Sequence, residues 1–178
     1  VFAVQPARGD DFTDIANARF AEISPGRRSD TILLPLIAQM TPPPKAVATL
    51  ENAILLPPQK AGWSEAEAWA TAPPQAAVLA AITKVTQEQD WKRAYGFGQP
   101  YGIEGIDPAM VRTNLYTDLG DPPTLAGARF HYLAGLDRVA LLVHVEATRL
   151  TAAGRVSDAI DLLTNWGFFA RQICDRQF

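Results

Sequence analysis

Proline constrains this chain more than any other residue type, because it is distributed unevenly. Ten of the fourteen prolines lie at or before Pro74, and none lies after Pro123. Proline has no backbone N–H and clashes with the preceding helical turn, so it ends or kinks helices. We therefore expect residues 1–74 to form short helices joined by extended connectors, and the last 55 residues to form long uninterrupted helices.

Apolar residues recur with helical spacing along most of the chain. Positions i, i+3, i+4 and i+7 lie on one face of an α-helix, so this pattern predicts a helix with one buried side. It predicts helices at about 12–23, 44–55, 64–72, 74–90, 107–116, 124–153 and 156–176. No segment alternates apolar and polar residues for long enough to predict a sheet. We therefore predict an all-α fold of six to eight helices, in an irregular bundle or a short repeat-like array with proline-rich connectors.

Two local signals refine these helices. Ser64 and Glu67 have the spacing of a capping box, in which each side chain accepts a hydrogen bond from an unpaired amide at the helix start. Pro35 lies in the apolar run 31–37, where it either kinks a short helix or leaves the segment extended. The sequence leaves both alternatives open.

Length and composition limit the class of protein. The chain has 178 residues, of which 48% are hydrophobic, so it is long enough for one compact domain and too short for two full ones. We expect residues 1–74 and 75–178, the latter with a C-terminal hairpin, to be parts of one domain. A mean hydropathy of −0.02 excludes a disordered chain, and the net charge of −3 disfavours a nucleic-acid partner. No run of eighteen apolar residues predicts a membrane span.

The C-terminal residues carry the most specific pattern. Gly154 is followed by Val156, Ala159 and Leu163. Glycine permits a tight turn between antiparallel helices, and a small alanine lets their axes approach closely. Over about 35 residues this spacing resembles one tetratricopeptide repeat, although Leu150 stands where that family has a tyrosine and no second copy follows at a fixed period. The resemblance implies a helical hairpin that binds protein and performs no chemistry.

Three glycines lie close together in one loop, at Gly96, Gly98 and Gly102. A dinucleotide site needs G-x-G-x-x-G directly after a strand, with the third glycine opening a helix. Here Tyr101 takes the third position, Pro100 has no amide to donate, and no strand is predicted before the loop. The sequence therefore predicts no nucleotide cofactor.

The same loop is rich in aromatic side chains. As a candidate interaction surface we name Trp91, Arg93, Tyr95, Phe97 and Tyr101. Rigid aromatic side chains and arginine are enriched at protein-binding hot spots, and aromatic rings also stack on sugars or on single-stranded bases. The alternative, which we favour, is that these aromatic side chains pack into the core between helices.

Chemically reactive residues are scarce. The single cysteine, Cys174, excludes an internal disulfide framework and a multi-cysteine metal site, and its position beside Ile173 indicates a buried small hydrophobe. On one continuous helix His131 and His144 lie on different faces, so they do not share a metal ion, and we expect His144 to be a half-buried helical residue. No serine lies in a G-x-S-x-G motif. We therefore predict no catalytic residue, no metal and no cofactor.

These observations favour a non-catalytic helical subunit that binds or scaffolds proteins in a larger assembly, with a protein partner or a second copy of the chain. The alternative is a small-molecule-binding or enzyme domain with its site under the loop of residues 91–105, where Glu104, Arg129 and His131 supply the polar groups. Proline-rich segments that expose apolar side chains favour the first interpretation. A deep pocket joining the loop to a histidine favours the second.

The compartment stays open. The chain begins with Val1, and residues 1–3 suit the end that a signal peptidase leaves. An extracytoplasmic location after N-terminal processing is therefore one expectation.

Overall fold

The structure is a computed structural model that describes residues 9–88, 94–103 and 105–177. These residues form eight α-helices, four short 3₁₀ helices and one pair of two-residue strands, so the predicted all-α class is confirmed. Trp91, Arg93 and Glu104, which the sequence placed in candidate sites, lie outside the described residues.

The first half of the described chain consists of short helices, in line with its prolines. They are α1 (Gly9–Ala18), η1 (Arg19–Glu22), η2 (Pro25–Arg27), α2 (Ser29–Ile37), η3 (Lys45–Val47), α3 (Leu50–Leu55) and α4 (Trp63–Ala70), where η marks a 3₁₀ helix. Pro35 lies inside α2, so the segment that the sequence left open is helical. This helix persists although Pro35 has no N–H to donate, because Leu33, Leu34 and Ile37 pack into the core.

The second half contains the longer helices. α5 (Pro73–Thr86) is followed by α6 (Pro108–Arg112), β1 (Thr117–Asp118), η4 (Leu125–Gly127), β2 (Arg129–Phe130), α7 (Leu133–Ala152) and α8 (Val156–Gln177). The strands β1 and β2 pair antiparallel, with Thr117 opposite Phe130. The predicted helix over residues 124–153 therefore begins only at Leu133, because residues 129–130 are extended and pair with β1.

Two predicted helix starts are wrong by a few residues. In the segment predicted as one helix from Pro44, α3 begins only at Leu50, where the hydroxyl of Thr49 accepts a hydrogen bond from the amide of Asn52 at 3.2 Å. The capping box at Ser64 does not start α4, because the helix already begins at Trp63. The residue before it is Gly62, with φ of 91°. An added Cβ at Gly62 would lie 2.6 Å from the Cβ of Ala46, so this turn requires glycine.

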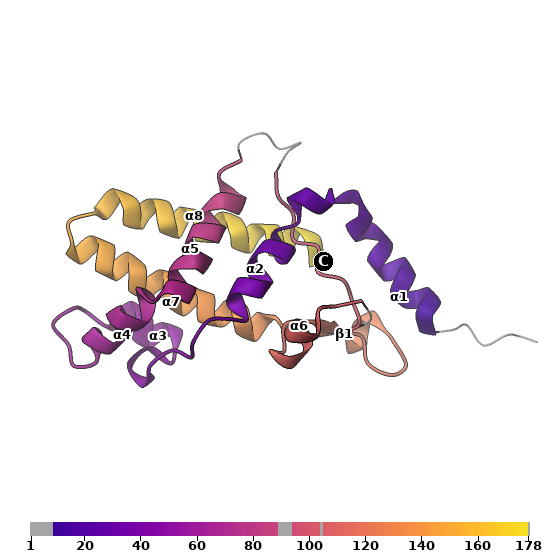
Figure 1. Cartoon of the computed structure of the whole chain (residues 1–178), viewed down its shortest axis with the longest axis horizontal. Coiled ribbons are helices and arrows are strands. Elements are labelled where there is room, and N and C mark those ends of the chain that lie inside the picture. Colours follow the sequence, from indigo (N-terminus) through magenta and orange to yellow (C-terminus); the bar gives the residue numbers. More distant parts are fainter. Residues whose placement is uncertain (1–8, 89–93, 104, 178) are drawn as a thin grey trace, which may run out of the picture.

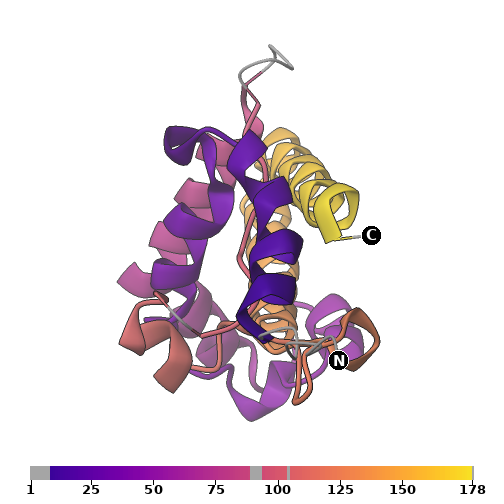
Figure 2. The same cartoon turned by 90° about the vertical axis from the view of Figure 1, so that its right-hand side faces the viewer.

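The long helices α7 and α8 form the centre of the molecule. They run antiparallel as a hairpin, with α3 and α4 packed on α7 and with α5 packed on α8 (Figure 1). α2 packs on α5, and these two helices form a layer beside the hairpin (Figure 2). The core between them draws on apolar residues from Leu33 to Ile173, so both the proline-rich first half and the hairpin contribute to it.

Gly154 turns the chain between α7 and α8. Its φ of 76° lies in the left-handed region, which glycine adopts without strain. The amide of Gly154 donates to the carbonyl of Thr151 at 3.0 Å, and the amide of Arg155 donates to the carbonyl of Leu150 at 2.8 Å. These two bonds make a Schellman motif, which satisfies the last carbonyls of α7. The predicted hairpin thus forms at the predicted glycine, whereas its relation to the tetratricopeptide family stays a prediction.

The N-terminal helix α1 projects away from the rest of the molecule (Figure 1, right). The predicted apolar stripe over residues 12–23 does not form one continuous face, because α1 ends at Ala18 and the chain continues as η1. Ile15 in α1 is 73% exposed, whereas Phe20 and Ile23 beyond it are buried. Asn17 holds the end of α1: its Nδ2 donates to the carbonyl of Tyr101 at 3.1 Å, and its Oδ1 accepts from the amide of Tyr101 at 2.7 Å.

Candidate functional site

Two of the described residues in the candidate interaction surface lie inside the molecule. Phe97 is fully buried, with its ring centroid 5.1 Å from that of Tyr132 and 6.2 Å from that of Phe169. Tyr101 is also buried, 5.9 Å from the ring of Phe20. These two side chains therefore present no surface to a partner and take the core role that the sequence favoured, because apolar rings lose their contact with water there.

Tyr95, the third described residue of the candidate interaction surface, is half-buried. The guanidinium carbon of Arg27 lies 5.0 Å from the centroid of its ring, a distance at which a cation is attracted by the ring face. Arg27 also lies 3.5 Å from the carboxylate of Glu88. Tyr95 is thus tied to the start of α2 rather than presented alone.

The loop is anchored to the residues before and at the start of α2. The amide of Ser29 donates to the carbonyl of Gly96 at 3.0 Å, and the amide of Gly96 donates to the carbonyl of Arg27 at 3.0 Å. One position further on, the buried carboxylate of Asp30 accepts a hydrogen bond from the amide of Gly98 at 2.9 Å. These bonds fix the loop at two successive points, so its path does not depend on side-chain packing alone.

An ion pair completes this anchor. The guanidinium of Arg28 forms an ion pair with Asp30 and donates through Nη2 to the carbonyl of Gly98 at 2.7 Å. Asp30 is 3% exposed, and a carboxylate this deeply buried is stable only when it is paired and hydrogen-bonded. The sequence did not point to Arg28 and Asp30. Its one signal was an arginine and an aspartate two positions apart at the start of an apolar helix.

A cavity of about 300 Å³ lies under the loop. It is lined by α2, α6 and the loop, with Arg28, Asp30, Thr31, Leu34, Pro35, Gln99, Pro100, Gly105, Ile106, Asp107, Met110 and Leu115 around it. Two of the polar groups predicted for a site under this loop do not line the cavity: Arg129 is exposed on β2, and the ring of His131 packs against that of Tyr116, with 4.7 Å between the centroids. The third, Glu104, lies outside the described residues.

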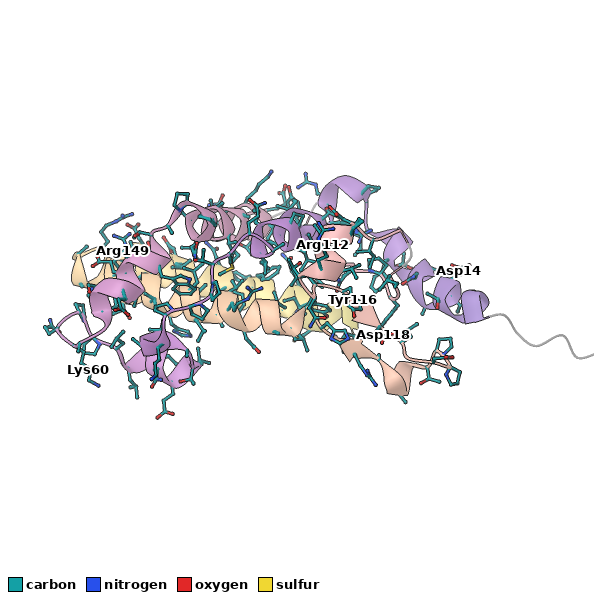
Figure 3. The ribbon with its side chains drawn as sticks, turned by 60° about the horizontal axis from the view of Figure 1, so that its bottom comes forward. Asp14, Lys60, Arg112, Tyr116, Asp118 and Arg149 are labelled. Atoms are coloured by element: carbon teal, nitrogen blue, oxygen red, sulfur yellow. The ribbon has the colours of Figure 1, made fainter. Side chains whose placement is uncertain are left out.

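A second hollow, the α3–α8 groove, lies over α7 between α3 and α8. It has a volume of about 480 Å³ and is lined by Ile54, Pro58, Gln59, His144, Ala147, Thr148, Thr151, Ala152, Val156, Ala159, Ile160 and Leu163. Ile54 is 51% exposed and Ile160 is 58% exposed. Figure 3 places Lys60 and Arg149, which belong to this part of the molecule, at the end opposite Asp14 of α1. Apolar side chains therefore gather on a surface that the described residues leave exposed.

The α3–α8 groove is electrically neutral around neutral pH. Among the described residues that line it there is no aspartate, glutamate, lysine or arginine. Burial lowers the pKa of His144, since the charged imidazolium loses hydration there, and so the ring is neutral at pH 7. On the two helices of the hairpin, Arg149 pairs with Glu146 and Arg155 pairs with Asp158, and none of these four residues lines the groove. A charged ligand finds no counter-charge among the lining residues.

The reactive residues form no cluster in the structure. Cys174 is exposed, so its predicted burial is wrong: Ile173 occupies the inward position on that turn of α8. His144 is half-buried in a helix, as predicted. No group of three or more histidine, cysteine or acidic side chains suited to a metal ion occurs within residues 9–88, 94–103 and 105–177. Within the same residues no helix is both long enough and apolar enough to cross a membrane.

No protein-family model, no curated protein and no solved structure matches this chain. Of the two hollows, the α3–α8 groove is the more apolar and the more exposed to solvent, and the cavity under the loop has the more polar groups.

Proposed function

We propose that this chain is a non-catalytic protein-binding subunit, and that its α3–α8 groove receives an amphipathic helix of a protein partner. The observation that carries the proposal is the exposed row of Val156, Ile160 and Leu163 on α8, which faces Ile54 across the α3–α8 groove. Exposed apolar side chains that are contiguous mark protein interaction sites, whereas scattered ones are ordinary.

The spacing of this row matches a helical ligand. Val156, Ile160 and Leu163 stand at positions i, i+4 and i+7, which is the spacing through which one helix packs its side chains against another. The buried residues that line the α3–α8 groove are small, namely Ala147 and Ala159. Small side chains let the backbone of an incoming helix approach closely, so a helix fits better than a flat surface.

Charge selects the face of the partner that enters. Because the lining carries no charged side chain and His144 is neutral, an ion entering the α3–α8 groove would lose its hydration without gaining a counter-ion. The entering face must therefore be apolar, as it is on one side of an amphipathic helix. Fully burying one leucine or isoleucine contributes about 1.5–3 kcal/mol, so half-exposed side chains still contribute about 1 kcal/mol each.

Two further observations support a binding role. The short helix α3, which prolines flank on both sides, exposes Leu50, Ile54 and Leu55, and such exposed apolar residues in the proline-rich half favour a subunit that contacts a neighbour. The tetratricopeptide-like spacing around Gly154 implies the same role, since that family binds proteins. Both observations concern the same end of the molecule, where α3 and the turn at Gly154 lie.

A designed peptide tests the proposal directly. The probe is a labelled helical peptide of about 18 residues with leucine at every i, i+3, i+4 and i+7 position, and its control is a peptide of equal composition without that stripe. Fluorescence anisotropy should show binding of the striped peptide at least tenfold tighter than that of its control.

Variants locate the binding surface. Ile160→Lys places a charge in the α3–α8 groove and should abolish binding of the striped peptide, whereas the matched variant Thr164→Lys, one turn further along α8 and outside the lining residues, should leave it unchanged. Binding that ignores Ile160→Lys contradicts the proposal. Light scattering on the free protein measures its oligomeric state and tests the other possible occupant, a second copy of the chain. If the free protein is a dimer and Ile160→Lys dissociates it, a second copy and not a partner fills the α3–α8 groove.

A further inference from the structure

The cavity under the loop has the features of a small ligand site, independent of the α3–α8 groove. We propose that this cavity, between α2, α6 and the loop, binds a small uncharged organic molecule. Such a molecule has an apolar body of about the size of one ring and one oxygen that accepts hydrogen bonds, as in an amide, a ketone or an alcohol. Arg28 is the group that recognises the oxygen.

The apolar walls set the size of the ligand. Leu34, Met110 and Leu115 are buried side chains that line one part of the cavity, and Pro35 and Pro100 line another without offering an N–H. A dry cavity of about 150 Å³ holds benzene. The present cavity, at about 300 Å³, therefore has room for a ring and one polar substituent.

Arg28 provides the donor. Its Nε and Nη2 are engaged by Asp30, and Nη2 also donates to the carbonyl of Gly98. Among the residues that the structure describes, Nη1 makes no hydrogen bond, so it keeps two N–H groups for an acceptor. Arg28 lines the cavity and its side chain is only 24% exposed, so we infer that an acceptor in the cavity reaches these groups with little competition from water.

The charge of Arg28 is already balanced, which selects against an ionic ligand. Asp30 is buried beside the guanidinium, and Asp107 adds a second carboxylate at the cavity wall. An anionic ligand would meet both carboxylates, and a cation would meet the guanidinium. An uncharged acceptor avoids both penalties and still uses the N–H groups of Arg28.

Gln99 shapes the cavity rather than binding the ligand. Its Nε2 donates to the carbonyl of Leu115 at 2.6 Å, and its Oε1 accepts from the hydroxyl of Thr117 at 3.2 Å. Both ends of this buried amide are therefore occupied by the protein. These two hydrogen bonds of Gln99, together with the bond from the amide of Gly98 to Asp30, hold the loop in place. The cavity therefore exists before a ligand arrives, and binding of a ligand orders little of the chain.

Three probes with one ring test the class of ligand. They are cyclohexanecarboxamide, cyclohexanecarboxylate and cyclohexylmethylammonium. Binding of each probe is measured by methyl-selective NMR of the full chain. The carboxamide should shift the methyl signals of Leu34, Ile106 and Met110 and saturate at about 1 mM or below, and each ion should bind at least tenfold more weakly. A carboxylate that binds as tightly as the amide, or the absence of shifts at these methyl groups for all three probes, would overturn the proposal.

Matched variants test the two halves of the site. Arg28→Lys preserves a cation beside Asp30 but removes the Nη1 donors, so it should weaken carboxamide binding about tenfold, whereas Arg155→Lys, at an exposed ion pair far from the cavity, should not. Met110→Trp should fill the cavity and abolish binding of the carboxamide. If that variant does not fold, as judged by its NMR spectrum, Ile106→Trp takes its place. Unchanged carboxamide binding in the folded tryptophan variant or in Arg28→Lys contradicts the assignment.

Discussion

The carboxylate of Asp30 accepts a hydrogen bond from the backbone amide of Gly98, although 68 positions separate the two residues in the chain. One buried side chain thereby joins the first turn of α2 to the loop that walls the cavity. The guanidinium of Arg28 contacts both partners, so three residues form one unit. Much of the geometry of the loop depends on this unit.

The first prediction concerns Asp30. Asp30→Asn should lower the free energy of unfolding by about 2–4 kcal/mol, because it removes the partner of a partly buried guanidinium and weakens the acceptor for the amide of Gly98. Urea denaturation measures the loss, and hydrogen exchange at Gly98 should become faster. The exposed Asp161→Asn serves as the control, with a change below about 0.5 kcal/mol. Equal stability of the two variants would show that the ion pair does not anchor the loop.

Two glycines in helices give opposite predictions. An added Cβ at Gly135 would lie 2.6 Å from Cδ2 of Leu115 and 3.0 Å from Cγ2 of Ile37, so Gly135→Ala should cost about 1–3 kcal/mol through overpacking. At Gly167 an added Cβ meets no atom within 4 Å, so Gly167→Ala should stabilise α8 by up to about 1 kcal/mol. Thermal unfolding compares the two proteins. A stabilised Gly135→Ala variant would contradict the close packing of α7 on α2.

The turn between α7 and α8 gives a third prediction. Gly154→Ala should lower the free energy of unfolding by about 1–2 kcal/mol, because a residue with a Cβ is strained at φ of 76°. Space is not the reason, since an added Cβ meets no atom within 4 Å there. Gly26→Ala, at an exposed position with neither a positive φ nor a close neighbour, is the matched control and should be nearly neutral. Chemical denaturation of both variants separates backbone strain from general loss of glycine.

The fourth prediction is a pH dependence due to His144. Burial lowers its pKa in the folded protein below the usual value of 6.5, so the unfolded chain binds the proton more readily. The contribution of His144 to stability is therefore fully present above pH 6.5 and is lost as the pH falls through the folded-state pKa. His144→Gln should show a smaller loss of stability between pH 7.5 and pH 5 than the parent protein does. Identical pH profiles of the two proteins would contradict this account.

The helices with one consistent apolar face were predictable from the sequence. Val78, Ala81, Ile82 and Val85 recur with helical spacing, and all four are buried in α5. Their spacing, together with the prolines at the start of α5, depends only on neighbours within a few turns. The same holds for the hairpin, since Gly154 satisfies a local requirement for a left-handed residue.

The position of the α3–α8 groove and the residues that line the cavity under the loop were not predictable from the sequence, for a physical reason. α8 carries two apolar rows, one with Leu162 and Phe169 and another with Val156 and Ile160. Periodicity shows that both rows are apolar, but only packing against α7 and α5 decides which one is buried. The exposed Cys174 illustrates the same limit, because its neighbour Ile173 takes the inward position.

Local patterns thus predicted a helical chain whose helices are short before Pro74 and long after Pro123. They could do so because helix formation and the exclusion of proline from helices act over a few residues. They did not specify which aromatic side chains of the loop are buried, nor that Arg28 and Asp30 meet Gly98. Those outcomes depend on contacts between segments far apart in the chain, where burial of apolar area and pairing of buried charges are decided jointly. Only the tertiary structure therefore decided where the α3–α8 groove lies and which side chains line the cavity under the loop.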